Sequence, residues 1–239
     1  MYNSAWPKMY WQLYDYFFMP NGAFYGARTA CEPLHIQYCY GDSSIKIVNC
    51  FYKDFNGLKV DYKIFDFNMK LVKSGLGDAN VAADASEKVY KLDFPKEITK
   101  VFFLKLELLG ESDKLLSSNF YWLSSNGDEK ADFTDLSKLP ASSVNVTASA
   151  LQKVGNKYKM SVTIENPGAT LAFAVNPKIL KLKSKAPVLP VFWEDNYFSL
   201  LPGEKKTVQV EFDAKDLDGD KPVLKVEGWN VAANEKEVK

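Results

Sequence analysis

The chain has 239 residues, enough for one large domain or for two domains of about 100 residues each. Its composition, 46% hydrophobic and 25% charged, is that of a globular protein. The 30 basic side chains balance the 30 acidic ones, so charge gives no support for a nucleic-acid or anionic-membrane partner. No apolar run approaches the roughly 20 residues of a membrane span, and the N-terminus lacks the pattern of a signal peptide.

The N-terminal segment differs in pattern from the rest of the chain. Apolar and aromatic residues recur at helical spacing over residues 6–18, which predicts a helix with a wide buried face. Pro7 is tolerated in a first helical turn, and Pro20 and Gly22 end the run. A second short helix is predicted over residues 23–31. So much aromatic surface needs a large partner, and we expect the segment to fold back on the first domain that follows or to pack against a second copy.

From residue 34 the pattern changes to the two-residue alternation of β-strands. Seven short strands in about 90 residues are typical of an immunoglobulin-like sandwich, which is predicted over residues 34–125. Residues 78–86 are small and polar and are predicted to form a loop. The predicted strands are Leu34–Tyr40, Ser44–Tyr52, Leu58–Phe67, Lys70–Ser74, Lys88–Phe94, Thr99–Leu109 and Ser118–Ser124.

A second sandwich of similar size is predicted over residues 139–235. Residues 126–138 have little apolar content and are predicted to be the linker, and the charged tail from Asn230 to Lys239 is expected to fray. The predicted fold class is therefore mainly β, with two immunoglobulin-like β-sandwiches after a short helical segment, residues 1–33. The predicted strands of the second sandwich are Ser143–Leu151, Lys157–Glu165, Ala172–Lys183, Val188–Trp193, Tyr197–Leu200, Lys205–Phe212 and Val223–Trp229.

The three cysteines, Cys31, Cys39 and Cys50, show no metal-ligand spacing. Their odd number argues against a disulfide framework. With a hairpin turn at residues 41–44, Cys39 and Cys50 would not be direct cross-strand partners. We expect free, buried thiols, no metal and no cofactor.

Several phrases of the sequence resemble glycoside hydrolase family 2, on its exo-β-glucosaminidase and β-mannosidase branch. The phrases occur in the family's order and extend over nearly the whole chain. They are NSAW (Asn3–Trp6), WQLYDY (Trp11–Tyr16), MPNGAFYGA (Met19–Ala27), ACEPLHIQY (Ala30–Tyr38), NFYWLS (Asn119–Ser124), DFTDL (Asp132–Leu136) and VLPVFWEDNYFSLLPGE (Val188–Glu204). The resemblance implies that residues 1–33 are the end of a (β/α)8 catalytic barrel, followed by two sandwich domains.

The resemblance supplies no catalytic acid. A retaining glycosidase needs two carboxylates about 5–5.5 Å apart, and the family places them on barrel strands that would precede Met1. In the barrel-like segment, Asp15 and Glu32 are interpreted as structural hydrogen-bond acceptors. The single histidine, His35, lies between apolar neighbours and is expected to be packed and hydrogen-bonded.

Carbohydrate contact is the remaining possibility, because sugars bind against aromatic faces with Asp or Asn side chains on their hydroxyls. Asn3 and Trp6 resemble residues at the mouth of the family's barrel. A second candidate is the run Trp193-Glu194-Asp195-Asn196-Tyr197, where Trp193, Asp195 and Asn196 could contact a glycan. The competing interpretation is structural: a strand end followed by an Asx turn, with Tyr197 and Phe198 entering the core.

The leading hypothesis is a pair of non-catalytic accessory domains that brace the missing barrel of a family 2 β-glycosidase. The alternative is an independent carbohydrate-binding module with an aromatic platform at Trp193. An active glycosidase is the least supported of the three. The expected partners are the barrel, a glycan and, through the N-terminal aromatic segment, a second copy. The resemblance implies a periplasmic or secreted parent enzyme.

Overall fold

The fold is described from a computed structural model, in which residues 12–238 are described. The chain divides into two compact units, one of residues 27–138 and the other of residues 1–26 together with 139–239. Each unit is built around a β-sandwich, which confirms the predicted mainly β fold class. No helix among residues 12–238 is long and apolar enough to cross a membrane.

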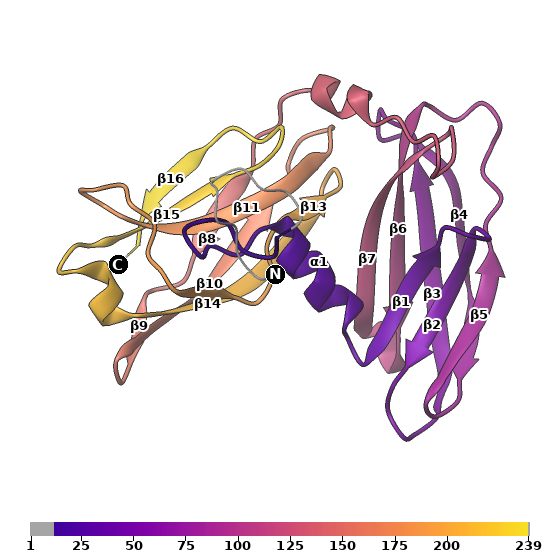
Figure 1. Ribbon diagram of the computed structural model, residues 1–239, viewed down its shortest axis with the longest axis horizontal. Helices are drawn as coiled ribbons and strands as arrows, with labels where there is room; N and C mark the ends of the chain where they lie inside the picture. The colour runs from indigo at the N-terminus through magenta and orange to yellow at the C-terminus, as the bar shows by residue number, and fades with distance from the viewer. Residues whose placement is uncertain (1–11, 239) are drawn as a thin grey trace. The chain divides into compact units, whose positions relative to one another are not determined.

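The first sandwich packs a three-stranded sheet, in the order β1-β2-β5, against a four-stranded sheet in the order β4-β3-β6-β7 (Figure 1). Every pairing between neighbouring strands is antiparallel. The strands are β1 (Leu34–Cys39), β2 (Ser44–Asn49), β3 (Phe55–Phe65), β4 (Leu71–Val81), β5 (Ala85–Lys91), β6 (Val101–Leu109) and β7 (Leu115–Ser124). A short 3-10 turn, η1 (Glu111–Asp113), joins β6 to β7.

The core of this sandwich follows the alternation of the sequence. On β3, Val60 and Ile64 are fully buried, and they lie opposite Leu108 and Leu104 of β6. Ile47 of β2 is equally buried and belongs to the same cluster. Burial of apolar side chains at about 25 cal/mol per Å² is the main force that holds the two sheets together.

The predicted loop over residues 78–86 is wrong in most of its length. Strand β4 continues to Val81 because Ala79 and Val81 are small enough to pack and are both buried in the core. Strand β5 begins at Ala85, so only residues 82–84 are left for the connection. In sequence the end of β4 resembles a loop because Gly77, Asp78 and Asn80 are of residue types that are depleted in strands.

The second sandwich has one sheet in the order β12-β14-β10-β8, with β9 also paired to β10, and another in the order β13-β11-β15-β16. Its strands are β8 (Asn145–Ala148), β9 (Gln152–Val154), β10 (Lys157–Glu165), β11 (Ala172–Lys181), β12 (Val191–Trp193), β13 (Phe198–Leu200), β14 (Lys205–Asp213), β15 (Pro222–Glu227) and β16 (Asn234–Glu237). A 3-10 helix, η3 (Ala214–Leu217), follows β14, and another, η2 (Thr134–Lys138), precedes the sandwich.

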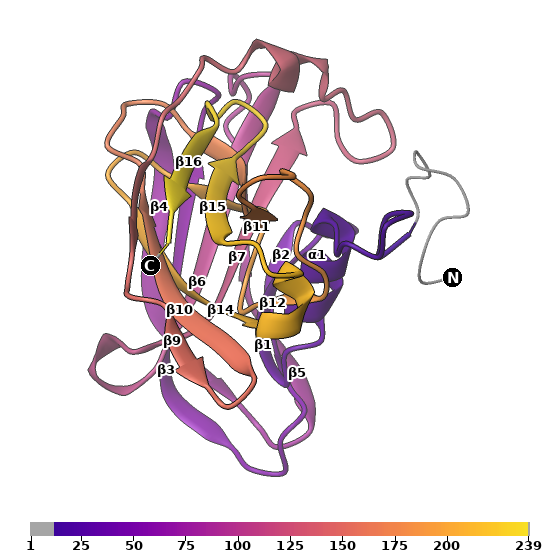
Figure 2. The same ribbon diagram turned by 90° about the vertical axis from the view of Figure 1, so that its left-hand side faces the viewer.

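The C-terminal tail does not fray as predicted. Strand β16 pairs with β15 from Val226↔Asn234 to Val223↔Glu237, and Figure 2 shows the two strands side by side. All four residues of β16 are exposed. The tail is held because Val231 and Val238, on either side of β16, are buried in the core.

Gly228, just after β15, sits where no side chain fits. A Cβ at this position would lie 2.9 Å from the backbone oxygen of Phe173, which already accepts a hydrogen bond from the Trp229 amide. We therefore expect Gly228→Ala to destabilise the second sandwich by about 1–3 kcal/mol, as overpacking does. Chemical denaturation would measure the loss.

The matched control is Gly26→Ala in helix α1 (Gly22–Ala30), where a Cβ has nothing within 4 Å. In a helix interior this change should stabilise by about 0.5–1 kcal/mol. If both variants unfold at the same denaturant concentration, the account of Gly228 is wrong.

The first helix predicted in the N-terminal segment is not formed in the described residues. Residues 12–20 form a turn closed by an antiparallel bridge between Tyr14 and Pro20, not a helix. The carboxylate of Asp15 accepts the amide hydrogens of Phe17 and Met19, both at 2.9 Å, and so competes with helical bonding. The part of the predicted helix before Gln12 lies outside the described residues. The second predicted helix is confirmed as α1.

The segment packs on the second sandwich, so the expected folding back on the first sandwich is wrong. Tyr25 of α1 is buried in the core of the second sandwich, and its ring lies 6.1 Å from that of Tyr197. Phe24 packs against the same core and contacts Tyr14 at 5.3 Å. The second sandwich is therefore the partner against which Tyr25 and Phe24 of the segment pack.

The cysteines are free, as expected, but the prediction that they are buried is wrong. Cys31 and Cys50 are exposed and Cys39 is partly exposed. The hairpin turn lies one residue earlier than predicted, so Cys39 faces Ser44. Cys50 follows the end of β2, where its amide donates to Pro33.

Candidate functional sites

The predicted site at Trp193–Tyr197 forms a corner between β12 and β13. Trp193 is only 5% exposed and belongs to the core of the second sandwich. Asn196 is buried as well, and its side-chain amide donates to the carbonyl of Pro177 at 2.9 Å. The side-chain oxygen of Asn196 accepts the amide hydrogen of Tyr197, which has a left-handed φ of 55°. Asp195 forms an ion pair with Lys206.

These contacts bear out the core part of the structural interpretation, because Phe198 enters the core and Tyr197 packs against it. The bonds of Asp195 and Asn196 go to the amide of the next residue, whereas an Asx turn is closed two residues on, so they are not the predicted Asx turn. The structure brings Asp195 and Asn196 together as chain neighbours but gives them no common open face with Trp193. The two other predicted sugar contacts, Asn3 and Trp6, lie outside the described residues.

The space beside this corner is too small for a sugar. A cavity of about 20 Å³ is lined by Met19, Pro20 and Tyr25 of the N-terminal segment and by Trp193 and Asn196, among others. This volume holds about one water molecule, which needs roughly 10–15 Å³. The N-terminal segment thus seals the corner.

Asp15 and Glu32 of the barrel-like segment, and His35 just after it, have structural partners. Ser117 donates to the carboxylate of Glu32 at 2.9 Å. His35, which is 3% exposed, lies with its Nε2 3.2 Å from the side-chain amide of Asn119 and its Nδ1 3.6 Å from Glu32. Asp15 accepts two backbone amides, as described above. The interpretation of Asp15 and Glu32 as acceptors, and of His35 as a packed residue, is confirmed.

The first sandwich carries an open hollow that the sequence did not indicate. Its cavity is about 170 Å³, and its walls include Tyr38, Tyr40, Phe94 and Phe133, with Asp128 from the loop after β7. Tyr40 is 49% exposed, so about half of this side chain is open to solvent. These residues come from separate parts of the chain, and no local motif links them.

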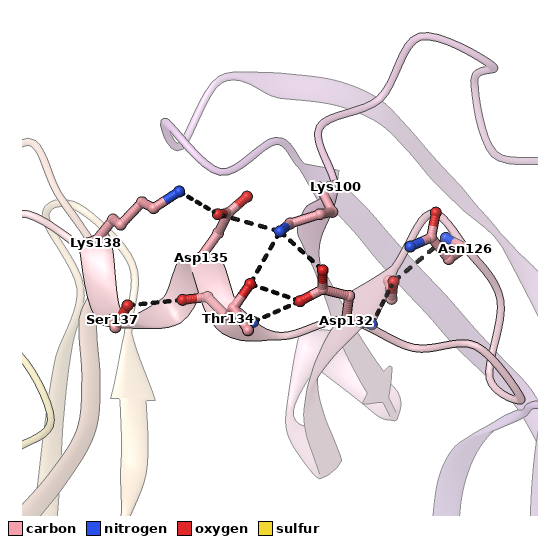
Figure 3. A network of polar contacts seen from close by, with 8 residues as sticks. Lys100, Asn126, Asp132, Thr134, Asp135, Ser137 and Lys138 are labelled. Carbon is pink, nitrogen blue, oxygen red and sulfur yellow. Dashed lines mark hydrogen bonds and ion pairs between the residues drawn. The ribbon is translucent and has the colours of Figure 1, made fainter.

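The segment between the sandwiches is held by a polar network around Lys100 (Figure 3). The Lys100 ammonium contacts Asp132 at 3.0 Å, the Thr134 hydroxyl at 3.0 Å and Asp135 at 3.3 Å. Lys138 contacts the same carboxylate of Asp135 at 2.8 Å. Hydrogen bonds from the Thr134 hydroxyl and amide, followed by the bond from Lys100, lower the pKa of Asp132. The DFTDL phrase is thus an anchored turn.

Removing the Lys100 charge should shift the titration of this network. In Lys100→Met, the pKa of Asp132 should rise but stay below its ordinary value, because the two bonds from Thr134 remain. A depressed carboxyl pKa stabilises the fold above the ordinary pKa near 3.9, and this contribution is lost as pH falls through the folded-state value. The variant should therefore show a smaller loss of stability in acid. NMR titration of the Asp132 carboxyl carbon measures the shift.

The control for this experiment is Lys59→Met, which removes a comparable exposed ion pair, that with Asp113, elsewhere on the same sandwich. It should leave the titration of Asp132 unchanged. An unchanged Asp132 titration in Lys100→Met would contradict the role given to Lys100.

Residues 12–238 contain no group of three or more His, Cys, Asp or Glu side chains that could hold a metal ion. Two open aromatic features are a hollow on the first sandwich and a turn in the N-terminal segment, where Phe17 and Phe18 are 60% and 67% exposed. The described fold is that of two immunoglobulin-like β-sandwiches, and this defines the class of protein.

Comparison with known proteins places this class in a family. Residues 119–231 match the family described as exo-β-D-glucosaminidase Ig-fold domain, and residues 41–126 match the mannosidase Ig/CBM-like domain. The chain is 33% identical to an exo-β-D-glucosaminidase of Amycolatopsis orientalis over 96% of its own length, and 34% identical to one of Streptomyces avermitilis over 97%. These alignments cover only 24% and 28% of the relatives, so the chain spans about a quarter of their length.

A solved structure agrees with the sequence matches. The crystal structure of the exo-chitosanase of Amycolatopsis orientalis matches 99% of this chain with a TM-score of 0.88 and 31% identity, and the match covers 30% of that enzyme. A β-D-mannosidase from Dictyoglomus thermophilum, 22% identical with a TM-score of 0.62, shares the fold. The chain consists of immunoglobulin-like domains of glycoside hydrolase family 2, of the exo-β-glucosaminidase and mannosidase type.

Proposed function

We propose that this chain supplies non-catalytic accessory domains that brace the barrel of a family 2 β-glycosidase acting on β-glucosaminides. The observation that carries the proposal is the continuous match to exo-β-glucosaminidases over 96–97% of the chain, in a region whose matched families are described as Ig-fold domains. The substrate class is taken from these relatives, which are exo-β-D-glucosaminidases. The barrel as partner is taken from the resemblance of residues 1–33 to the end of the family's barrel.

An exposed aromatic turn supports a partner for the N-terminal segment. Tyr16, Phe17 and Phe18 are 46%, 60% and 67% exposed in succession. The turn that carries them is fixed by Asp15 and is followed by the buried Tyr25. Contiguous apolar surface of this kind marks an interaction site in soluble proteins. We assign it to the barrel, because the segment resembles the end of the family's barrel.

The bracing role can be tested by complementation. The Amycolatopsis enzyme would be shortened to lack the region that matches this chain, and this chain would be added as a separate protein. We expect complex formation on gel filtration and a higher melting temperature of the shortened enzyme. The positive control is the enzyme's own missing region. Rescue by that region but not by this chain would count against the bracing role.

The surface involved can be tested in the same assay. Replacing both Phe17 and Phe18 with serine should abolish complex formation, while Phe192→Ser, at a 61% exposed position of the second sandwich, should not.

The non-catalytic assignment has its own test. The purified chain should give no turnover of nitrophenyl β-glucosaminide or β-mannoside, and measurable, saturable turnover would overturn that assignment.

A carbohydrate-binding module is the second candidate, because residues 41–126 match a family whose description includes the words CBM-like. Trp193, the platform expected from the sequence, is buried, so a binding face would have to lie elsewhere. Titration with chitosan oligomers separates the two roles. Saturable binding that persists in Trp193→Phe would show a carbohydrate-binding role in addition to bracing, and absence of binding would leave the bracing role alone.

A further inference from the structure

The hollow on the first sandwich has two kinds of wall. One is aromatic: Tyr38 contacts Tyr40 edge to face at 5.0 Å and Phe94 at 6.0 Å, and both neighbours line the cavity with it. The other is polar, with Ser43 beside Tyr38 and Asp128 on the loop after β7. The Tyr38 hydroxyl is used in a bond of 3.2 Å to Ser43. Within residues 12–238, the Tyr40 hydroxyl makes no hydrogen bond.

The charge in the hollow is a single carboxylate close to the tyrosine rings. Burial raises the pKa of Tyr38 and of Tyr40, and in both cases the negative charge of Asp128 raises it further. In the described part of the chain the Asp128 carboxylate has no ion-pair partner. An unpaired carboxylate in a hollow that is also lined by tyrosine rings attracts a cation, because both the negative charge and the ring quadrupole favour it.

The size of the hollow restricts the ligand. Its volume of about 170 Å³ exceeds the roughly 30 Å³ share of one water several-fold. It is smaller than the 300–1,000 Å³ of pockets for drug-sized ligands. A single small ring fits this description. The carboxylate repels phosphates and other anions, whereas the serine hydroxyl and the Tyr40 hydroxyl suit a ring that carries hydroxyl groups.

We propose that this hollow binds one protonated amino-sugar ring, with its C–H face on Tyr40 and its ammonium group toward Asp128. The site is separate from the accessory role proposed above, since domains that only brace a barrel need no sugar contact. It would place one cationic sugar unit on the first sandwich, at a distance along the chain from the predicted contacts at Asn3 and Trp6.

The test compares two methyl glycosides that differ at one position. Methyl β-D-glucosaminide carries an ammonium group at carbon 2, and methyl β-D-glucoside carries a hydroxyl there. Titration of the ¹⁵N-labelled chain, at slightly acidic pH and low salt, should give saturable amide shifts at Ser43, Gly127 and Asp128. Affinity in the millimolar range is expected for one ring, about −4 kcal/mol, with the glucosaminide about fivefold tighter than the glucoside, as for one partly exposed ion pair.

Four variants locate the interaction. Asp128→Asn should remove the preference for the glucosaminide, whereas Glu129→Gln, the same charge change at the next residue, which does not line the hollow, should preserve it within about twofold. Tyr40→Ala should weaken both glycosides about tenfold, and Tyr40→Phe, which keeps the ring, much less. These residues are exposed or half exposed, so the variants should fold.

Three results would overturn the proposal. They are the absence of saturable shifts at the hollow, equal affinity for the two glycosides, and an equal loss in Asp128→Asn and Glu129→Gln. None of them bears on complex formation with a barrel, so the two proposals fail separately.

Discussion

Replacing Trp193 with alanine should lower the free energy of unfolding of the second sandwich by about 3–5 kcal/mol, the usual range for a buried tryptophan. Trp193 is 5% exposed, and its strand pairs it with Val210, which is also in the core. Removal of the indole ring would leave a cavity between β12 and the opposite sheet. Because a domain has only about 5–15 kcal/mol of stability in total, this change should remove a large share of it and raise the unfolded population by about a hundredfold or more.

The measurement is hydrogen exchange of the β10 and β14 amides, which follows the second sandwich alone. Phe192→Ala is the matched control, since the neighbouring ring is 61% exposed and its loss should change stability by less than about 0.5 kcal/mol. Trp193→Ala that kept full protection but lost affinity for chitosan oligomers would show that the residue serves a ligand and not the core.

The strands could be predicted from sequence where one face of the sheet is buried. Strand β10 matches its predicted bounds, residues 157–165, because Met160, Val162 and Ile164 alternate with polar residues. Strand β16 carries no such signal, since its four residues are all exposed; it is held by its pairing with β15 and by the buried Val231 and Val238 on either side. The alternation of apolar and polar residues reflects the burial of one face, so an edge strand without a buried face shows no alternation.

The N-terminal segment shows how a side chain can override periodicity. The apolar spacing over residues 6–18 satisfies a helix, but the Asp15 carboxylate takes two amide hydrogens of the following turn. A short polar side chain that bonds its own backbone favours a turn over a helix. The sequence also could not predict that this segment packs on the second sandwich, because Tyr25 and Tyr197, whose rings are in contact, are more than 170 residues apart in the chain.

The candidate sites were predictable only in part. The structural interpretation of the Trp193 corner followed from local residues, and its core part is borne out, but the predicted Asx turn at Asp195 and Asn196 is not formed. The hollow combines Tyr40, after β1, with Asp128, after β7, and only the pairing of the sheets brings them to one cavity. Local patterns give turns and faces, whereas a cavity depends on long-range register.

Replacing Tyr25 with alanine should detach the N-terminal segment from the second sandwich and destabilise that sandwich by about 3 kcal/mol. Tyr25 is 5% exposed, the only buried residue of α1, and its ring contacts both Phe24 and Tyr197. Without it, the apolar surface around Tyr197 and Trp193 that the segment seals would meet water. Hydrogen exchange should then become fast for the Met19 amide, which is bonded to Asp15 in the folded segment.

The control is Phe17→Ala, which removes a ring of similar size that is 60% exposed in the same segment. It should leave both stability and the Met19 exchange rate nearly unchanged, because little area is removed from water at that position on folding. If Phe17→Ala destabilised the sandwich as much as Tyr25→Ala, the segment would be held by its exposed turn. An effect of Tyr25→Ala alone shows that one buried ring fixes the segment, while Phe17 and Phe18 stay on its surface.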